Sequence, residues 1–159
     1  MPTMYMLIGV PASGKSTWRE QYKGDALVIS SDDLIEEYAK SQDKTYNDVF
    51  KEQIKIANKI VLENVQAAFA AGQDVIWDQT NITKKSRKAK LAMVPEHYRK
   101  TAVFFATPLE EEWQRRLNSR PGKSIPAYIL DSMVEMLEMP EQDEGWDIIE
   151  YHLNAKEPK

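Results

Sequence analysis

The chain has 159 residues, 42% hydrophobic and 29% charged, with 21 Lys and Arg against 25 Asp and Glu and a formal net charge of −4. This composition excludes low-complexity disorder, and no apolar run reaches the roughly 20 residues that a membrane-spanning helix needs. The N-terminus lacks the basic start and cleavage site of a signal peptide, and the absence of cysteine excludes disulfides and thiolate chemistry. We therefore expect one cytoplasmic domain over residues 1–159.

Short apolar runs alternate with helical patterns along the chain. The runs suit parallel strands that are buried on both faces, and they cover residues 4–8, 26–30, 75–77 and 101–106, with a weaker one at 147–151. This alternation predicts an α/β fold with a doubly wound parallel sheet of four to five strands, flanked by helices. The acidic stretch 141–144 and the tail after Asn154 are expected to be solvated surface.

The clearest helical pattern has apolar side chains at spacings of three and four between residues 50 and 68. Thr45 and Asp48 precede it with the spacing of a capping box, and Gly72 follows it as a helix-ending glycine. These signals predict one long helix between the second and third strands.

A phosphate-binding pattern, G-x-x-x-x-G-K-[ST], occupies residues 9–16 between the first strand and a helical segment at 15–21. Its glycines let successive backbone N–H groups point at phosphates, and the N-terminus of the helix favours the same anion. Lys15 would reach the β- and γ-phosphates, while the Ser16 hydroxyl would bind Mg²⁺. The residues expected to bind nucleotide here are Gly9, Pro11, Ala12, Ser13, Gly14, Lys15, Ser16 and Thr17.

The nucleotide is expected to be ATP. Switch GTPases carry Asn-Lys-x-Asp, but Asn58-Lys59-Ile60 is followed here by Val61 rather than Asp. Large ATPase motors need a much longer chain. A small P-loop kinase that uses ATP and Mg²⁺ is therefore the economical interpretation.

Acidic residues follow two of the predicted strands, at the edge where ligands bind in open α/β sheets. Asp32 is predicted to accept the proton of the attacking hydroxyl. Asp33 is predicted either to contact the substrate beside Asp32 or to stabilise the N-terminus of a helix through its negative charge. Asp78 is predicted to orient Mg²⁺ through water or to position substrate. The neighbouring Thr80 and Asn81 are predicted to contact substrate as well. The alternative for each acid is a purely structural role at a helix start or in a capped loop.

A turn-rich segment at 118–124 has the composition of a mobile lid. Helices are predicted on both sides, one beginning at Thr107 with Pro108 in its first position, and one running from Pro126 to near Leu137. Arg116 and Arg120 would fold over the phosphates, stabilise their charge and exclude water. Surface arginines on a solvated loop are the alternative.

Charge is unevenly distributed along the sequence. Residues 84–123 contain 11 Lys or Arg and 4 Asp or Glu, whereas the rest of the chain contains 10 basic and 21 acidic residues. A basic tract directly after Asn81 suits a polyanionic substrate, although it is equally compatible with a solvated helix face. The tract consists of Lys84, Lys85, Arg87, Lys88 and Lys90, of which Arg87 is predicted to contact substrate.

Four segments together resemble the kinase domain of phage-type 5′-polynucleotide kinases, within the P-loop kinases. They are Gly-Val-Pro-Ala-Ser-Gly-Lys-Ser-Thr-Trp18, Ser-Asp-Asp33, Thr80-Asn81 and Arg-Leu-Asn-Ser-Arg-Pro-Gly-Lys-Ser-Ile-Pro126, in the order of that family. The resemblance implies phosphorylation of the 5′-hydroxyl end of DNA or RNA, in nucleic-acid repair and in the host cytoplasm if the chain is phage-encoded. It further implies that Lys15 and Ser16 hold ATP and Mg²⁺, that Asp32 is the general base, and that Arg120 and Arg116 are lid arginines.

Two positions depart from the pattern of that family. Ile35 stands where many members carry an arginine for the acceptor's phosphate, and Gln79 rather than Asp directly precedes Thr80. Phosphatase and ligase motifs are absent, which predicts a stand-alone kinase. Together with the net negative charge, Ile35 keeps a second hypothesis open: a kinase of a small hydroxylated molecule such as a nucleoside, sugar or antibiotic. A non-catalytic nucleotide-dependent switch is the third, and Asp32 and Arg120 argue against it.

Overall fold

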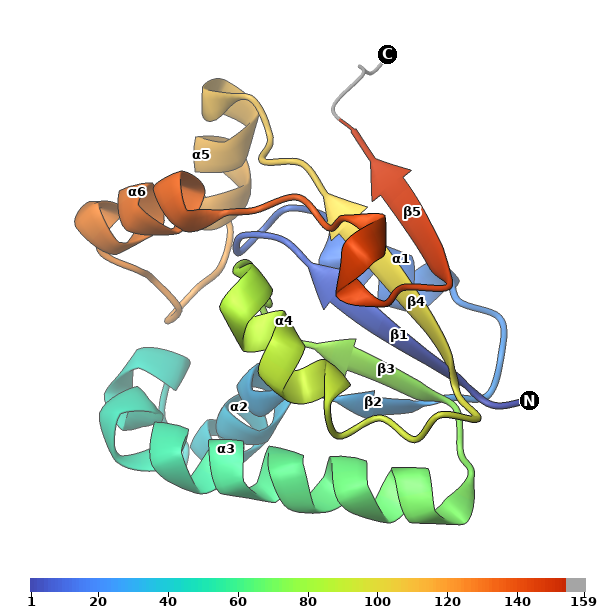
Figure 1. Cartoon of the computed structure of the whole chain (residues 1–159). Coiled ribbons are helices and arrows are strands. Elements are labelled where there is room, and N and C mark those ends of the chain that lie inside the picture. Colours follow the sequence, from blue (N-terminus) through green and yellow to red (C-terminus); the bar gives the residue numbers. More distant parts are fainter. Residues whose placement is uncertain (154–159) are drawn as a thin grey trace.

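The computed structural model describes residues 1–153 and contains a five-stranded parallel sheet (Figure 1). The strand order is β2-β3-β1-β4-β5, and all four pairings are parallel. The strands are β1 (Thr3–Ile8), β2 (Leu27–Ile29), β3 (Val75–Asp78), β4 (Arg99–Phe105) and β5 (Ile148–His152). Each overlaps a predicted apolar run, so the predicted α/β fold is confirmed. The predicted solvated tail after Asn154 lies outside the described residues.

Helices cover both faces of the sheet because alternate side chains of the buried strands point to opposite sides. On one face, Met4 and Met6 of β1 join a cluster with α3 (Tyr46–Ala71) and with Leu91 at the end of α4 (Lys84–Leu91). On the other face, Leu7 packs with Trp18 of α1 (Lys15–Gln21). The central strand β1 is therefore buried on both sides.

The long helix predicted between β2 and β3 is α3. Thr45 and Asp48 form its capping box, and Gly72 ends it in the left-handed conformation with φ 68°, as predicted. The preceding helix, α2 (Ser31–Ser41), packs against α3 through Ile35, which is fully buried. Ile35 is therefore a core residue and not a contact for substrate.

The helices α5 (Glu110–Asn118) and α6 (Ala127–Met136) lie beyond the carboxyl ends of the strands (Figure 1). The start of α6 after Pro126 agrees with the prediction, but the predicted start of α5 at Thr107 is wrong. Leu109 precedes the first turn of α5 without a side-chain cap, and three glutamates in that turn complement the helix dipole instead. A short 3₁₀ helix, η1 (Gln142–Glu144), precedes β5.

This topology creates one favoured place for a ligand. Because β1 lies between β3 and β4, the strand order changes direction there, and a crevice opens at the carboxyl ends of the strands. The loop after β1, the start of α2 and residues 78–80 all meet at this edge. No helix within residues 1–153 is both long and apolar enough to cross a membrane.

Candidate active site

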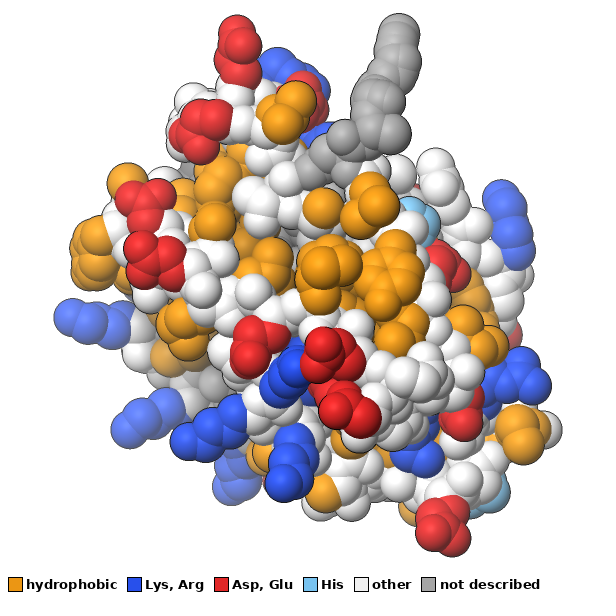
Figure 2. Space-filling view, turned by 45° about the horizontal axis from the view of Figure 1, so that its top comes forward, with side chains coloured by type: hydrophobic (Ala, Val, Ile, Leu, Met, Phe, Trp, Pro, Cys, Tyr) orange, Lys and Arg blue, Asp and Glu red, His pale blue; other side chains and the backbone are white. Residues whose placement is uncertain are grey.

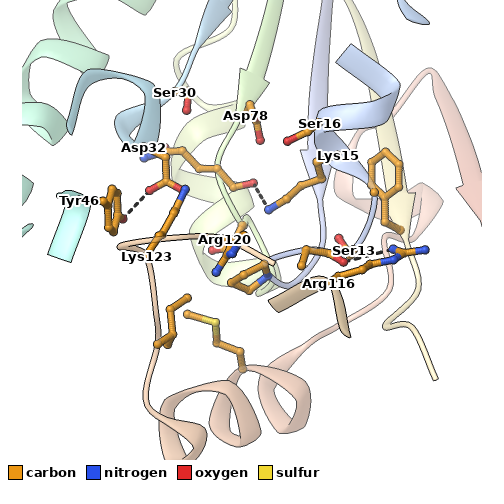
Figure 3. Close-up of a pocket in the computed structure, with 18 of the residues that line it drawn as sticks. Ser13, Lys15, Ser16, Ser30, Asp32, Tyr46, Asp78, Arg116, Arg120 and Lys123 are labelled. Atoms are coloured by element: carbon orange, nitrogen blue, oxygen red, sulfur yellow. Dashed lines mark hydrogen bonds and ion pairs between the residues drawn. The ribbon is translucent and has the colours of Figure 1, made fainter. Parts of the chain in front are cut away.

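A large open pocket occupies this crevice, and residues from many parts of the chain line it (Figure 3). Among them are the loop after β1, the starts of α2 and α3, the corner after β3, and the loop between α5 and α6. The pocket brings together most of the predicted site residues, namely Pro11, Ala12, Ser13, Gly14, Lys15, Ser16, Thr17, Asp32, Asp33, Asp78, Thr80, Arg116 and Arg120. Gly9, Asn81 and Arg87 are not among its lining residues.

The phosphate loop is held in a tight curl. Ala12 and Gly14 adopt left-handed backbone conformations, with φ 61° and 120°. A Cβ atom at Gly9 would lie 2.5 Å from the Ser13 Oγ and 3.3 Å from the Phe105 carbonyl, so glycine gives this close packing the room it needs. The Lys15 Nζ donates to the Gly9 carbonyl at 2.8 Å, and its burial lowers the pKa of Lys15. The amine of Lys15 is therefore buried inside the curl of the loop, shielded from water.

Two of the side chains around this loop carry buried polar atoms without a hydrogen-bond partner among residues 1–153. They are Ser13, through Oγ, and Arg120, through Nε and Nη2. Buried donors are normally paired, and an arginine fork is suited to phosphate oxygens. The donors present therefore fit the phosphates of a nucleoside triphosphate. Ser16, in the pocket wall, supplies the hydroxyl that could bind Mg²⁺.

The two predicted lid arginines differ in their surroundings. Arg116 donates from Nε to Glu112 at 2.7 Å and from Nη1 to the Ala12 carbonyl at 3.2 Å. Arg120 has no such bonds at Nε or Nη2. Arg116 is therefore held against the phosphate loop by hydrogen bonds, whereas the Nε and Nη2 donors of Arg120 are available to bind an anion.

Asp32 is held by side chains from two other elements. The Tyr46 hydroxyl donates to its Oδ1 at 2.8 Å, and the Lys123 Nζ lies 3.3 Å from its Oδ2. Burial, together with the charge of Asp32, raises the pKa of Tyr46, which keeps the phenol protonated as a donor. Asp32 thus has a fixed orientation in the pocket wall (Figure 3).

Asp33 and Asp78 share one partner, Arg19 of α1. Its Nη2 lies 2.7 Å from Oδ2 of Asp33, and its Nη1 lies 2.7 Å from Oδ2 of Asp78. The sequence reasoning missed Arg19, although it stands one helical turn after Lys15 on the same face of α1. The pair of contacts ties the start of α2 to the end of β3.

Residues 78–80 line the pocket, but the chain just beyond them is structural rather than open to substrate. Asn81 is buried with φ 50°, and its Nδ2 donates to the Leu7 carbonyl at 2.8 Å. Arg87 is fully buried, donating from Nη1 to the Asn81 carbonyl and from Nε to Glu144, at 2.9 and 2.8 Å. The prediction that Asn81 and Arg87 contact substrate is therefore corrected: their polar groups are engaged in holding this corner.

The basic tract on α4 lies outside the pocket lining. Lys84 forms an ion pair with Glu141, and Lys90 bonds to Gln79 and Asn81 behind the phosphate loop. Burial lowers the pKa of Lys90 to about 8. Lys85 and Lys88 are exposed, and basic and acidic side chains are intermingled on the face shown in Figure 2. The tract is thus not a continuous basic wall of the site.

A parallel sheet with β1 at its switch point and a phosphate loop that leads into α1 defines a P-loop nucleotide-binding protein of the kinase type. A family model described as AAA domain matches residues 4–140. The chain belongs to this family, and the class of enzyme that family and fold support is a kinase-type phosphotransferase.

The similar proteins include nucleic-acid proteins and small-molecule kinases. The chain is 26% identical, over 166 residues, to heterogeneous nuclear ribonucleoprotein U-like protein 2 of Mus musculus, covering 96% of this chain and 22% of that protein. It thus spans about a fifth of the length of this relative. A chain of the Pnkp1/Rnl/Hen1 RNA repair complex superposes with TM-score 0.65 at 26% identity, over 86% of this chain and 44% of that one.

A sugar kinase from a Janibacter species superposes with TM-score 0.62 at 18% identity, over 94% of this chain and 86% of that one. At this identity the likeness concerns the fold alone.

Proposed function

We propose that this protein is an ATP-dependent kinase that transfers the γ-phosphate to the 5′-hydroxyl end of DNA or RNA. The observation that carries the proposal is the oriented Asp32 carboxylate in the same pocket as Lys15 and the unpartnered Arg120 donors. A phosphoryl transfer needs these two functions on either side of the reacting atoms: an acceptor for the hydroxyl proton and donors for the phosphate charge.

On the phosphate side, ATP and Mg²⁺ would supply the phosphoryl group and its charge neutralisation. The residues proposed to hold them run from Gly9 to Thr17, with Lys15 and Arg120 on the phosphates and Arg116 beside them. Ser16 would bind the metal directly. Asp78 would do so through water, since Arg19 contacts its Oδ2 and leaves Oδ1 for this role.

On the acceptor side, Asp32 would orient the attacking hydroxyl and take its proton, with Asp33 and Thr80 in the adjoining wall. The chain would act as one kinase domain, in which residues 116–125, the end of α5 and most of the loop after it, are the lid. That loop would exclude water from the reacting groups.

The wall next to Asp32 supports a nucleoside as the acceptor. Phe50 lines the pocket one helical turn after Tyr46, with the ring centroids 5.4 Å apart, and it is 39% exposed. Ile54 extends this wall along α3, while Ile129 and Met133 line the pocket from α6. A flat base can stack on such a surface, whereas a sugar would leave its hydroxyls without partners.

A small hydroxylated molecule is the second candidate acceptor. Its support is that the α4 lysines lie outside the pocket and that the buried Ile35 provides no charge for an acceptor phosphate. Lys51, which is exposed and lines the pocket beside Phe50, is the α3 residue that could contact a phosphate in its place.

The test offers γ-labelled ATP with 5′-hydroxyl DNA and RNA oligonucleotides, with nucleoside 3′-phosphates, and with a panel of sugars and amino alcohols. We expect label on the oligonucleotides. Phe50→Ala should raise their KM roughly 5-fold to 100-fold, as expected for the loss of one stacked base. Ile56→Ala is the matched control, because Ile56 is exposed on the same helix but does not line the pocket. Label on the sugars alone, with no effect of Phe50→Ala, would favour the second candidate.

A further inference from the structure

The loop between α5 and α6, residues 119–126, is docked onto the start of α3. The backbone N–H of Asn47 donates to the Gly122 carbonyl at 3.0 Å, and its Nδ2 donates to the Ser124 Oγ at 2.7 Å. In return, the Ser124 N–H donates to the Asn47 Oδ1 at 3.1 Å. One residue of α3, Asn47, thus makes three hydrogen bonds to the loop, one through its backbone and two through its side chain.

Gly122 permits a close approach between the two segments. Its φ is +69°, and a Cβ atom there would lie 2.7 Å from the Cβ of Thr45. Any other residue would be strained in this conformation and would collide with the capping residue of α3. The docked position of the loop therefore depends on glycine at position 122.

Docking places the next residue, Lys123, among groups of α2 and α3. Its Nζ lies 3.3 Å from Asp32 Oδ2, 3.1 Å from Glu36 Oε2 and 4.6 Å from the ring centroid of Tyr46. The side chain is only 14% exposed, unlike the lysine of an ordinary surface loop. Figure 3 shows it reaching from the loop toward Asp32.

The two oxygens of Asp32 are consequently held by different parts of the chain. Tyr46 holds Oδ1 from α3, and Lys123 holds Oδ2 from the loop. Each carboxylate oxygen has two lone-pair sites, so both contacts leave room for an acceptor hydroxyl. The Tyr46 contact is built into α3, whereas the Lys123 contact exists only while the loop is docked.

The same loop carries Arg120, whose unpartnered donors are available to phosphate. Arg120 and Lys123 are three residues apart, so one docking step delivers a cation to each side of the reacting atoms. We propose that Lys123 is a positioning residue which couples docking of the α5–α6 loop to the orientation of Asp32. This inference rests on the proposed function, in which Asp32 is the general base.

The coupling can be tested without catalysis because it is reciprocal: if the loop orients Asp32, Asp32 must also hold the loop. In hydrogen exchange of the full chain, Asp32→Asn and Lys123→Met should each accelerate exchange of peptides covering 119–126 by about fivefold. Asp33→Asn is the matched control, because the neighbouring carboxylate contacts Arg19 and not the loop. Unchanged exchange in both test variants, or equal acceleration in the control, would overturn the proposal.

A kinetic cycle tests the consequence for turnover. Lys123→Met should lower kcat roughly tenfold while nucleotide affinity, measured by equilibrium binding, stays the same, and Lys123→Arg should recover part of the loss. In the Asp32→Asn background the same substitution should have no further effect, since Lys123 acts through Asp32. An equal loss in both backgrounds, or weaker nucleotide binding, would show instead that Lys123 acts on the phosphates.

The two failures are distinguishable. If the wild-type chain phosphorylates no offered acceptor, the proposed function fails while the exchange experiment still decides whether Lys123 and Asp32 are coupled. If the wild type is active but the exchange and kinetic results are negative, only the coupling fails.

Discussion

The phosphate side and the acceptor side of the pocket are built in different ways. The phosphate side is built mainly from one continuous segment, residues 9–17, whose curled backbone creates the binding surface and whose lysine is buried, and the α5–α6 loop adds Arg120 to it. The acceptor side is assembled from side chains of separate elements: Asp32 on α2, Tyr46 and Phe50 on α3, and Lys123 on the α5–α6 loop. A cradle of backbone N–H groups suits anions such as phosphate whatever they are attached to, whereas a wall of side chains can change its substrate with a few substitutions.

The comparison predicts different consequences for substitutions on the two sides. Changes on the phosphate side should affect nucleotide binding and turnover together. Changes on the acceptor side should lower turnover or raise the acceptor KM while leaving nucleotide affinity unchanged. The predictions below test this division, beginning with the largest effect.

Lys15→Ala is expected to abolish phosphoryl transfer and to weaken nucleotide binding. The Nζ of Lys15 is the cation inside the loop, and a point charge in a dry site contributes far more than one in water. The fold should persist, since burial lowers the pKa of Lys15 and so disfavours the charged lysine in the folded chain. Labelled transfer, nucleotide binding and a thermal melt provide the three measurements. Near-normal turnover would remove the P-loop kinase interpretation.

Asp32→Asn is expected to lower kcat by about 10²–10⁴, the range for loss of a general base, with little change in nucleotide affinity. The amide keeps the shape of the carboxylate but cannot accept the proton. Asp33→Asn should have a smaller effect, because Asp33 pairs with Arg19 rather than facing Tyr46 and Lys123. Measuring kcat and the nucleotide dissociation constant of both variants shows which carboxylate acts as the base. If Asp33→Asn is the more damaged enzyme, the base has been assigned to the wrong carboxylate.

The fold was largely predictable from the sequence because burial on both faces gives parallel strands a simple apolar pattern. The long helix α3 was equally clear, since Thr45, Asp48 and Gly72 mark both of its ends. The start of α5 was mispredicted because Thr107 and Glu110 have the right spacing, but the chain enters this helix from Leu109. A capping pattern is local, whereas the point at which a helix starts also depends on how the helix packs.

The lining of the candidate pocket was predictable where its residues are contiguous or directly follow a strand. The phosphate loop, Asp32 and Asp78 belong to this group. Tyr46 and Lys123 reach Asp32 only through packing of α3 and docking of a loop, and nothing in their local sequence indicates it. Arg87 shows the opposite error, because a basic residue in a basic tract turned out to be buried against Glu144.

Arg120→Ala is expected to lower kcat by about 10²–10³, because its unpartnered donors would lie where charge develops in the transition state. Arg116→Ala should be milder, since Arg116 is already bonded to Glu112 and to the Ala12 carbonyl. Arg120→Lys should recover little activity, as an ammonium cannot replace the planar fork. Steady-state kinetics of the three variants give the ranking. Full activity of Arg120→Ala would make the loop an ordinary surface loop.

The smallest expected effect is on the salt dependence of oligonucleotide affinity. This measurement shows which surface the acceptor strand contacts as it leaves Asp32. Each phosphate contact on a single strand contributes about −0.7 to the slope of log affinity against log salt. Lys51→Ala should reduce that slope by about this amount, because Lys51 lines the pocket beside Phe50. Lys55→Ala is the matched control, one helical turn further along α3 and outside the pocket lining.

Joint neutralisation of Lys84, Lys85 and Lys88 should change the slope less than Lys51→Ala does, although the sequence alone leaves the tract open either as a nucleic-acid contact or as a solvated helix face. Lys84 is paired with Glu141, and none of the three lines the pocket. A short oligonucleotide whose 5′ end is at Asp32 would therefore pass Lys51 before it could reach α4. If the triple variant flattens the slope for long oligonucleotides while Lys51→Ala does not, the strand must leave the pocket along α4. The Phe50 wall would then contact no more than the terminal nucleoside.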